Sequence, residues 1–139
     1  MKPAGALARL LPLIVGIEAI AFMIAAVLHL GVPLPVGFDE PVIIPAAIAE
    51  GLIGIFLAIA ALALLASDRL AWPLAVAAHV FGITGVLVGT FALAVGAGPS
   101  TEANTIYHRV ALAVLVAVLV LLLTERGRRA AGREPRARS

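Results

Sequence analysis

The sequence predicts an all-α membrane protein, a bundle of four transmembrane helices that run up and down in turn, and three observations predict it. First, 63% of the 139 residues are hydrophobic and only 13% are charged, which leaves too little polar surface to cover a soluble domain. Second, four apolar runs have about the 20 residues that a helix needs to cross a bilayer. Third, glycine, proline or charged residues bound each run, as expected at the ends of membrane helices.

The first span is predicted at about residues 10–30. This run is interrupted only by Glu18 and is closed by Gly31 and the prolines that follow it, through which a helix does not readily continue. The second span is predicted at about residues 43–66, where prolines stand near the start of the run and Glu50 is the single charge. Proline suits a first helical turn because no amide partner is lost there. Each of these two spans therefore carries one carboxyl group.

The third span is predicted at about residues 71–95, after a short polar hairpin, with Trp72 close to the membrane interface. The fourth is predicted at about residues 105–123, a run made almost entirely of alanine, valine and leucine, which Asn104 or Thr105 can cap. The connections between spans are too short to hold another domain. Residues 1–125 are therefore expected to form one membrane domain.

Lysine and arginine predict the orientation of this domain. Nine of the ten basic residues, Lys2 among them, fall on one side of a four-span hairpin, and only Arg109 falls on the other. Since cytoplasmic loops carry the excess of basic residues, both termini are expected in the cytoplasm. The abundance of alanine, valine, leucine and arginine is typical of a GC-rich bacterial genome, so the expected location is a bacterial inner membrane.

Residues 126–139 are rich in arginine and have no apolar face, so we expect a disordered cytoplasmic tail. Its first arginines, Arg126, Arg128 and Arg129, lie beside a helix end, where anionic lipid headgroups stabilise each of them by about 1 kcal/mol. Lipid contact is a simpler use of these charges than nucleic-acid binding. The expected partners are therefore the bilayer and a further copy or membrane subunit, with no nucleic acid.

Ionisable residues inside the spans are the first candidates for function, because a charge near the bilayer centre costs roughly 2.5 to 3.5 kcal/mol. Glu18 and His79 each lie about eight residues from the cytoplasmic end of their spans, so they are expected at one depth, where a Glu–His pair can share a proton. The alternative is a neutral carboxylic acid that hydrogen-bonds to a neighbouring helix. The same two interpretations apply to Glu50.

A second polar cluster is expected at the outer ends of the spans, where His29, Tyr107, His108 and Arg109 come close to the depth of Glu50. His29 follows Glu18 by eleven residues, which returns it to within about 20° of the same helical face. That face, with Phe22 and Ala25 between them, should therefore point into the bundle. The alternatives are that these residues rest in the headgroup region, or that Arg109 pairs with Glu50 or Glu102 and only fixes helix packing.

Glycines in the second and third spans predict close helix packing, since small residues four apart let backbones approach. The glycines concerned are Gly51, Gly54, Gly82, Gly85 and Gly89. A flat cofactor against the same glycines, beside His79, is the alternative.

The ligand set of His29, Glu50 and His108 suits zinc, iron or manganese. His29 and His108 also meet the depth requirement for bis-histidine haem ligation. No local spacing joins these residues on one helix, so the simplest expectation is that there is no cofactor. The chain has no cysteine, which excludes disulfides and thiolate metal sites. It also lacks nucleophile and phosphate-binding motifs, so no enzymatic activity is expected.

The region before and through the fourth span resembles the last span of uncharacterised four-helix membrane proteins of high-GC bacteria, in which a Gly-Pro loop leads to an asparagine, a Tyr-His-Arg step and a Leu/Val helix. The matching residues here are Gly98, Pro99, Asn104, Tyr107, His108 and Arg109. The resemblance covers about a sixth of the chain and implies an inner-membrane protein of unknown activity.

The sequence therefore favours an accessory or scaffold subunit that uses its glycine faces to pack. One alternative is a proton-linked carrier of a small solute that works through Glu18, Glu50 and His79. The other alternative is a haem or metal binder at His29 and His108.

Overall fold

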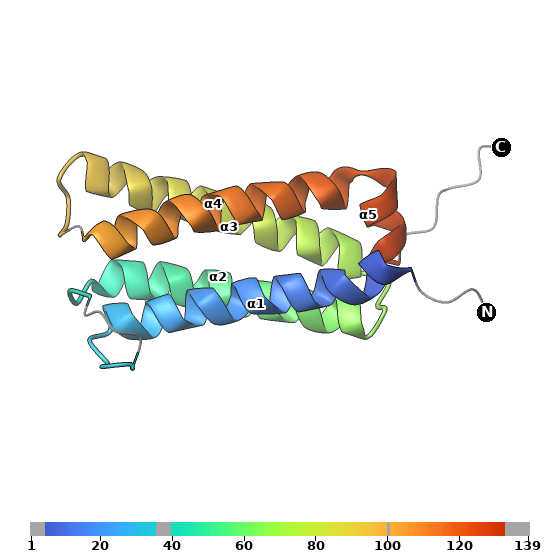
Figure 1. The fold of residues 1–139 in the computed structure, drawn as a ribbon, viewed down its shortest axis with the longest axis horizontal. Coiled ribbons are helices and arrows are strands. Elements are labelled where there is room, and N and C mark those ends of the chain that lie inside the picture. The colour runs from blue at the N-terminus through green and yellow to red at the C-terminus, as the bar shows by residue number, and fades with distance from the viewer. Residues whose placement is uncertain (1–4, 36–39, 100, 133–139) are drawn as a thin grey trace.

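Four long helices form an antiparallel bundle in the computed structural model, which describes residues 5–35, 40–99 and 101–132. The helices are α1 (Ala6–His29), α2 (Ile44–Leu65), α3 (Ala71–Ala94) and α4 (Glu102–Leu123), and a short helix α5 (Glu125–Ala130) follows them (Figure 1). Each of the first four is long and apolar enough to cross a membrane. The predicted all-α bundle of four spans is thus confirmed, and by length and composition the chain is a multi-pass membrane protein.

The helix boundaries follow local chemistry. α1 ends where Gly31 takes a φ of +80°, a conformation that glycine adopts without strain. α4 begins three residues before the predicted start, because the cap is Thr101, whose hydroxyl accepts the amide of Asn104 at 3.0 Å. The prediction that Asn104 or Thr105 caps this helix was therefore wrong.

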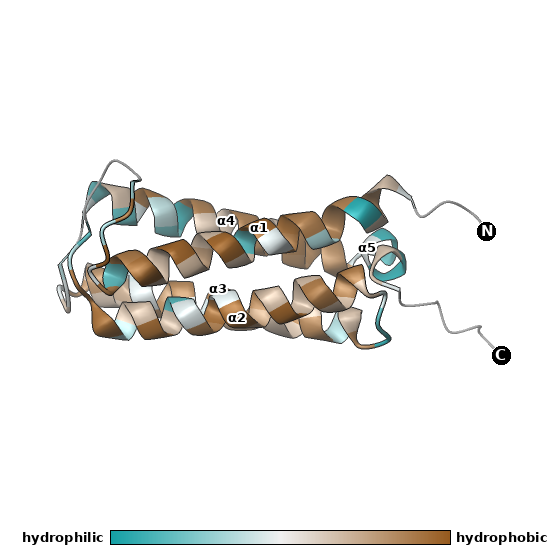
Figure 2. Cartoon of the chain, turned by 90° about the horizontal axis from the view of Figure 1, so that it is seen from below, coloured by the Kyte–Doolittle hydropathy of each residue, from teal (hydrophilic) through white to brown (hydrophobic). Residues whose placement is uncertain are grey.

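The bundle has two distinct ends (Figure 1). At the loop end lie the connections from α1 to α2 and from α3 to α4. At the terminal end lie Gly5, Gly132 and the α2–α3 hairpin, whose Ser67 lines the same depression as both of these glycines. Hydrophilic residues gather toward the two ends and brown, hydrophobic ribbon fills most of the length between them (Figure 2). A helix bundle that spans a bilayer has this distribution, with hydrophobic residues in the hydrocarbon region and hydrophilic residues at both surfaces.

The core is thin and is built from branched side chains that interleave with alanine and glycine. Leu11, Val15, Leu57 and Leu115 are fully buried, while many isoleucine, leucine and valine side chains on the outer faces are exposed, as lipid-facing residues are. The most extensive packing is between α1 and α2, followed by that between α2 and α3 and then that between α3 and α4. The backbones of α1 and α4 stay further apart and meet through side chains such as Phe22 and Tyr107, whose rings lie edge to face at 5.9 Å.

The expected disordered tail needs correction for its first residues, because α5 covers Glu125–Ala130 and Gly127 and Ala131 are buried. The chain turns sharply at Thr124, whose hydroxyl donates to the carbonyl of Leu121 and accepts the amide of Gly127. This cap starts a helix that the charge of the segment alone did not indicate. Residues 133–139 of the predicted tail, and Lys2, lie outside the described residues.

The side chain of Trp72 stabilises the corner between α4 and α5. Its indole N–H donates to the carbonyl of Leu122 at 2.9 Å, and the guanidinium of Arg128 lies 5.4 Å from its ring centroid. A cation over the face of a tryptophan is attracted to it. The start of α3 thus holds α5 across the terminal end of the bundle.

The Thr124→Ala variant is expected to loosen α5 by about 1 kcal/mol, since it removes the capping oxygen and the bond to Leu121. Hydrogen–deuterium exchange of the amides from Gly127 to Ala131 should be faster, with the other four helices unchanged. Thr84→Ala is the matched control, because the Thr84 hydroxyl is exposed and only bonds to the carbonyl of Val80 in its own helix. Equal exchange of α5 in both variants would contradict the capping role.

Candidate functional site

Glu18 on α1 and His79 on α3 meet inside the bundle. Glu18 Oε2 lies 3.1 Å from His79 Nε2, and the side chains are 6% and 0% exposed. The other ring nitrogen, Nδ1, donates to the carbonyl of Ala75 at 2.7 Å. This second bond fixes the ring, so that Nε2 faces the carboxyl group.

These bonds determine how the pair holds its proton. Because His79 Nδ1 carries the hydrogen that it gives to Ala75, Nε2 of a neutral ring has only a lone pair to offer. Glu18 must then be the protonated partner and donate to Nε2. The other state has the proton on Nε2, which donates to an ionised Glu18. One proton thus lies between two heavy atoms in either state, and the pair is neutral in both.

A second Glu–His pair lies nearer the loop end. His29 Nδ1 on α1 is 2.7 Å from Glu50 Oε2 on α2, and both residues are buried. His29 and Glu18 lie on the same buried face of α1, together with Phe22 and Ala25. At 1.5 Å per residue, eleven residues separate the two pairs by about 16 Å along the helix. One face of α1 therefore joins two carboxyl–imidazole pairs at two depths.

Each carboxyl group leaves one buried oxygen free. Glu18 Oε1 and Glu50 Oε1 have no hydrogen-bond partner in the part of the chain that the structure describes, and His29 Nε2 has none either. Beside Glu50 there is a space of about 40 Å³, which Phe22 and His108 also line and which has room for about one water molecule. Buried polar groups without partners usually mark a ligand, a water or a function.

His29, Glu50 and His108 do not converge as the metal-site hypothesis required. No group of three metal-ligating side chains occurs within residues 5–35, 40–99 and 101–132. His108 donates through Nδ1 to the carbonyl of Asn104 at 2.8 Å and has Nε2 beside Gly89 on α3, whereas His29 lines a different cavity, between α1 and α4. The two rings therefore line different cavities, and the Nδ1 bond of each ring fixes the direction in which its Nε2 points.

The glycines serve contacts within this chain. A Cβ at Gly54 would lie 2.9 Å from Met23, and a Cβ at Gly85 would lie 2.8 Å from Ile53. Gly82 has similarly little room, between Ile53 and Leu115. Gly51 and Gly89 have more room. A Cβ at Gly51 would meet its neighbour at an ordinary contact distance, and a Cβ at Gly89 would lie 3.4 Å from the His108 ring.

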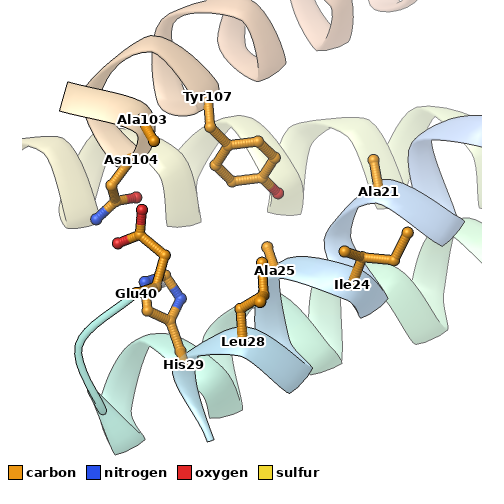
Figure 3. A pocket seen from close by; sticks show the side chains of 9 residues that line it. All are labelled: Ala21, Ile24, Ala25, Leu28, His29, Glu40, Ala103, Asn104 and Tyr107. Atoms are coloured by element: carbon orange, nitrogen blue, oxygen red, sulfur yellow. The ribbon is translucent and has the colours of Figure 1, made fainter. Parts of the chain in front are cut away.

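A second cavity lies between α1 and α4 and has a volume of about 230 Å³. Its lining residues are Ala21, Ile24, Ala25, Leu28 and His29 from α1, Glu40 from the connection to α2, and Ala103, Asn104 and Tyr107 from α4 (Figure 3). Figure 3 shows the Glu40 carboxylate, the Asn104 amide and the His29 ring at one end of this space, and the aliphatic side chains along the rest, into which the Tyr107 hydroxyl also points. The cavity thus has a polar end and a largely apolar body that contains one hydroxyl group.

Sequence reasoning missed Glu40 and Asn104 as members of a site. Glu40 stands three residues before the second predicted span. The sequence gives no sign that the hydroxyl of Thr101, 61 residues further on, would donate to its Oε1 at 2.6 Å. Asn104 was interpreted as a cap. Tyr107 and His108 follow Asn104 by three and four residues, which places all three on one face of a helix. This spacing was the available sign that Asn104 belongs to the site.

The basic residues lie at the surface. Arg126, Arg128 and Arg129 are exposed at the terminal end, and Arg129 pairs with Glu125 at 3.0 Å in a solvent-exposed position, which contributes little to stability. Their contact with lipid headgroups stays a prediction. Arg109 is exposed at the loop end and forms no ion pair with a described residue, so it does not pair with Glu50 or Glu102.

No protein-family model, no curated protein and no solved structure matches the chain. The resemblance of the fourth span to uncharacterised four-helix proteins therefore stays a prediction. The functional argument rests on the two Glu–His pairs and on the cavity beside one of them.

Proposed function

We propose that the chain is a proton-linked carrier of a small solute, set in a bacterial inner membrane with both termini in the cytoplasm. The observation that carries the proposal is the presence of two buried Glu–His pairs, Glu18–His79 and Glu50–His29, on one face of α1. An ionisable residue in a membrane span marks a proton or ion path by default. Two such pairs at two depths give protons two positions along the bundle.

The geometry supports exchange of protons rather than a purely structural bridge. A structural pair is stabilising when all of its polar atoms have partners. Here each carboxyl group keeps one buried oxygen without a partner among the described residues, and that oxygen is free to take or release a proton. Transfer from Glu18 to His79 Nε2 moves one proton by a short distance and leaves the pair neutral.

The link to a solute runs through His29. Its Nδ1 bonds to Glu50, and the same ring lines the cavity between α1 and α4. Whatever occupies this cavity therefore meets an imidazole whose protonation depends on Glu50. Solute binding and proton binding are coupled when both change the same group.

The other two functions receive less support from the contacts. The accessory role rested on glycine faces, and Gly82 and Gly85 face Ile53 and Leu115 of this same chain. The cofactor role rested on His29 and His108, which line separate cavities. The accessory role stays a prediction.

The proposal is tested by infrared difference spectroscopy of the full chain in detergent, as the pH is changed between about 5 and 8, the range in which imidazoles ordinarily titrate. We expect carboxyl signals that disappear in the Glu18→Gln and Glu50→Gln variants. In both, the amide keeps the shape of the side chain and can donate to the histidine, so the fold is retained. In proteoliposomes, the same variants should slow the proton exchange that dissipates an imposed pH gradient.

Glu102→Gln is the matched control, because Glu102 is an exposed carboxyl group in the first turn of α4. It should keep the wild-type proton flux and the buried carboxyl signals. The proposal fails if the wild type shows no titrating signal assigned to Glu18 or Glu50, or if both Gln variants conduct protons as fast as the wild type does.

A further inference from the structure

The cavity between α1 and α4 brings together four polar atoms that have no partner in the described parts of the chain. These atoms are His29 Nε2, Glu40 Oε2, Asn104 Oδ1 and the Tyr107 hydroxyl. All are buried, and the His29 and Asn104 residues are only 2% and 4% exposed. Since a buried polar atom without a hydrogen-bond partner is costly, four of them around one space indicate that this space has an occupant.

The surrounding bonds fix these atoms in place. Thr101 donates to the other oxygen of Glu40 at 2.6 Å, which holds the carboxyl group at the end of α4. The backbone carbonyl of Asn104 accepts from His108 at 2.8 Å, and Figure 3 shows the side-chain oxygen of Asn104 on the side of the cavity. The polar end is therefore preorganised for a ligand rather than formed by a loose loop.

The free atoms define the chemistry of the occupant. The oxygens of a carboxylate and an amide only accept hydrogen bonds, and neither lysine nor arginine occurs among the residues that line the cavity. A ligand must then bring both donors and positive charge to Glu40 and Asn104. The walls beyond the polar end are Ala21, Ile24 and Ala25, which suit a short aliphatic group.

We propose that this cavity binds a small organic cation, an alkylguanidinium or alkylammonium, with its head against Glu40 and Asn104 and its tail along the alanine and isoleucine of α1. The inference rests on the proposed carrier function, for which it names the class of solute. A guanidinium fits best, since its planar fork of donors matches a carboxylate. At about 30 Å³ per water-sized unit, a space of about 230 Å³ holds roughly eight non-hydrogen atoms, the number in butylguanidinium.

Occupation by a cation should displace a proton from His29. The groups that face this ring are Glu50 from α2, Glu40 from the connection, and Tyr107 and Asn104 from α4. With a guanidinium against Glu40, a second positive charge on the imidazole is disfavoured, and Nε2 offers its lone pair to the ligand instead. In the empty cavity His29, whose Nδ1 bonds to Glu50, also carries a proton on Nε2. Ligand binding releases that Nε2 proton to solution, so ligand and proton exchange one for one.

The experiment is isothermal titration of the full chain in detergent with butylguanidinium, in two buffers of different ionisation enthalpy. We expect saturable binding with release of a proton in the wild type. Butylurea, which has the same shape but no charge, and butyrate should bind at least roughly tenfold more weakly. Glu40→Gln and Tyr107→Phe, which preserve side-chain shape, should each weaken butylguanidinium binding, and Glu102→Gln should leave it unchanged.

The outcomes separate this inference from the carrier proposal. If butylguanidinium binds no better than butylurea, or binds Glu40→Gln as well as the wild type, the cation site is wrong, and the infrared titration still decides whether the pairs exchange protons. If the ligand binds as expected without proton release, the site stands and its coupling to His29 fails. Melting temperatures of all variants, measured without ligand, show that a loss of binding is not a loss of fold.

Discussion

Replacing His79 with leucine is expected to lower the free energy of unfolding by about 3 kcal/mol or more, the largest effect of any single change considered. The substitution leaves the Glu18 carboxyl group buried, 6% exposed, with neither oxygen paired to a described residue. Breaking one side of a buried pair costs more than removing both sides, since an uncompensated polar group remains. Reversible unfolding in mixed detergent micelles measures the difference.

A double-mutant cycle gives this prediction its control. Glu18→Met together with His79→Leu should recover most of the lost stability, because two apolar side chains then fill the volume of the pair. Glu18→Gln alone should cost little, since its amide donates to Nε2 of His79 while Nδ1 keeps its bond to Ala75. If His79→Leu and the double variant are equally stable, the pair contributes nothing and the buried-pair interpretation is wrong.

The features that sequence reasoning predicted correctly are those set by one helix or by the bilayer. Span length follows from hydrocarbon thickness, so all four helices lie within four residues of their predicted bounds. The meeting of Glu18 with His79 follows from their equal depth in the first and third spans, which run in the same direction in an up-and-down bundle. Likewise, the shared face of Glu18 and His29 follows from the helical repeat. These relations require only the rise and the period of an α-helix.

The features that sequence reasoning missed depend on how separate elements meet. Equal depth did not show that His108 turns toward Gly89 while His29 turns toward the cavity between α1 and α4, because depth leaves the rotation of each helix open. The position of Glu40 depends on the path of a connection and on a hydroxyl 61 residues further on. α5 depends on the cap at Thr124, a local bond that composition does not reveal. The rotation of each helix, the path of the connection that carries Glu40 and the cap at Thr124 are thus the features that the sequence did not predict.

The packing of α3 against α2 gives the second large effect, a loss of about 1 to 3 kcal/mol in Gly85→Leu. A Cβ at Gly85 would lie 2.8 Å from Ile53 Cδ1. Ile53 is 2% exposed and also limits the room at Gly82. The small space beside Glu50, which Gly85 and Ile53 both line, can take the tip of Ile53 but not a whole leucine side chain as well, so the helices must separate and that space should widen. Unfolding in mixed micelles again measures the change.

Gly16→Leu is the matched control for Gly85→Leu, since both are interior glycines of long helices and nothing lies within 4 Å of a Cβ at Gly16. Leucine has the higher helix propensity, so this variant should be more stable than wild type by about 0.5 kcal/mol. A loss of stability in Gly85→Leu together with a gain in Gly16→Leu would show that the contact with Ile53, and not the loss of a glycine as such, determines the effect. Equal losses of stability at both positions would mean that the bundle resists any added bulk, and the assignment of Gly85 to the α2–α3 interface would fail.

A loss of stability in Gly85→Leu accompanied by faster proton exchange at Glu50 would connect helix packing to the proposed function. The reason is that the residues that hold α2 and α3 together also limit the space beside that carboxyl group.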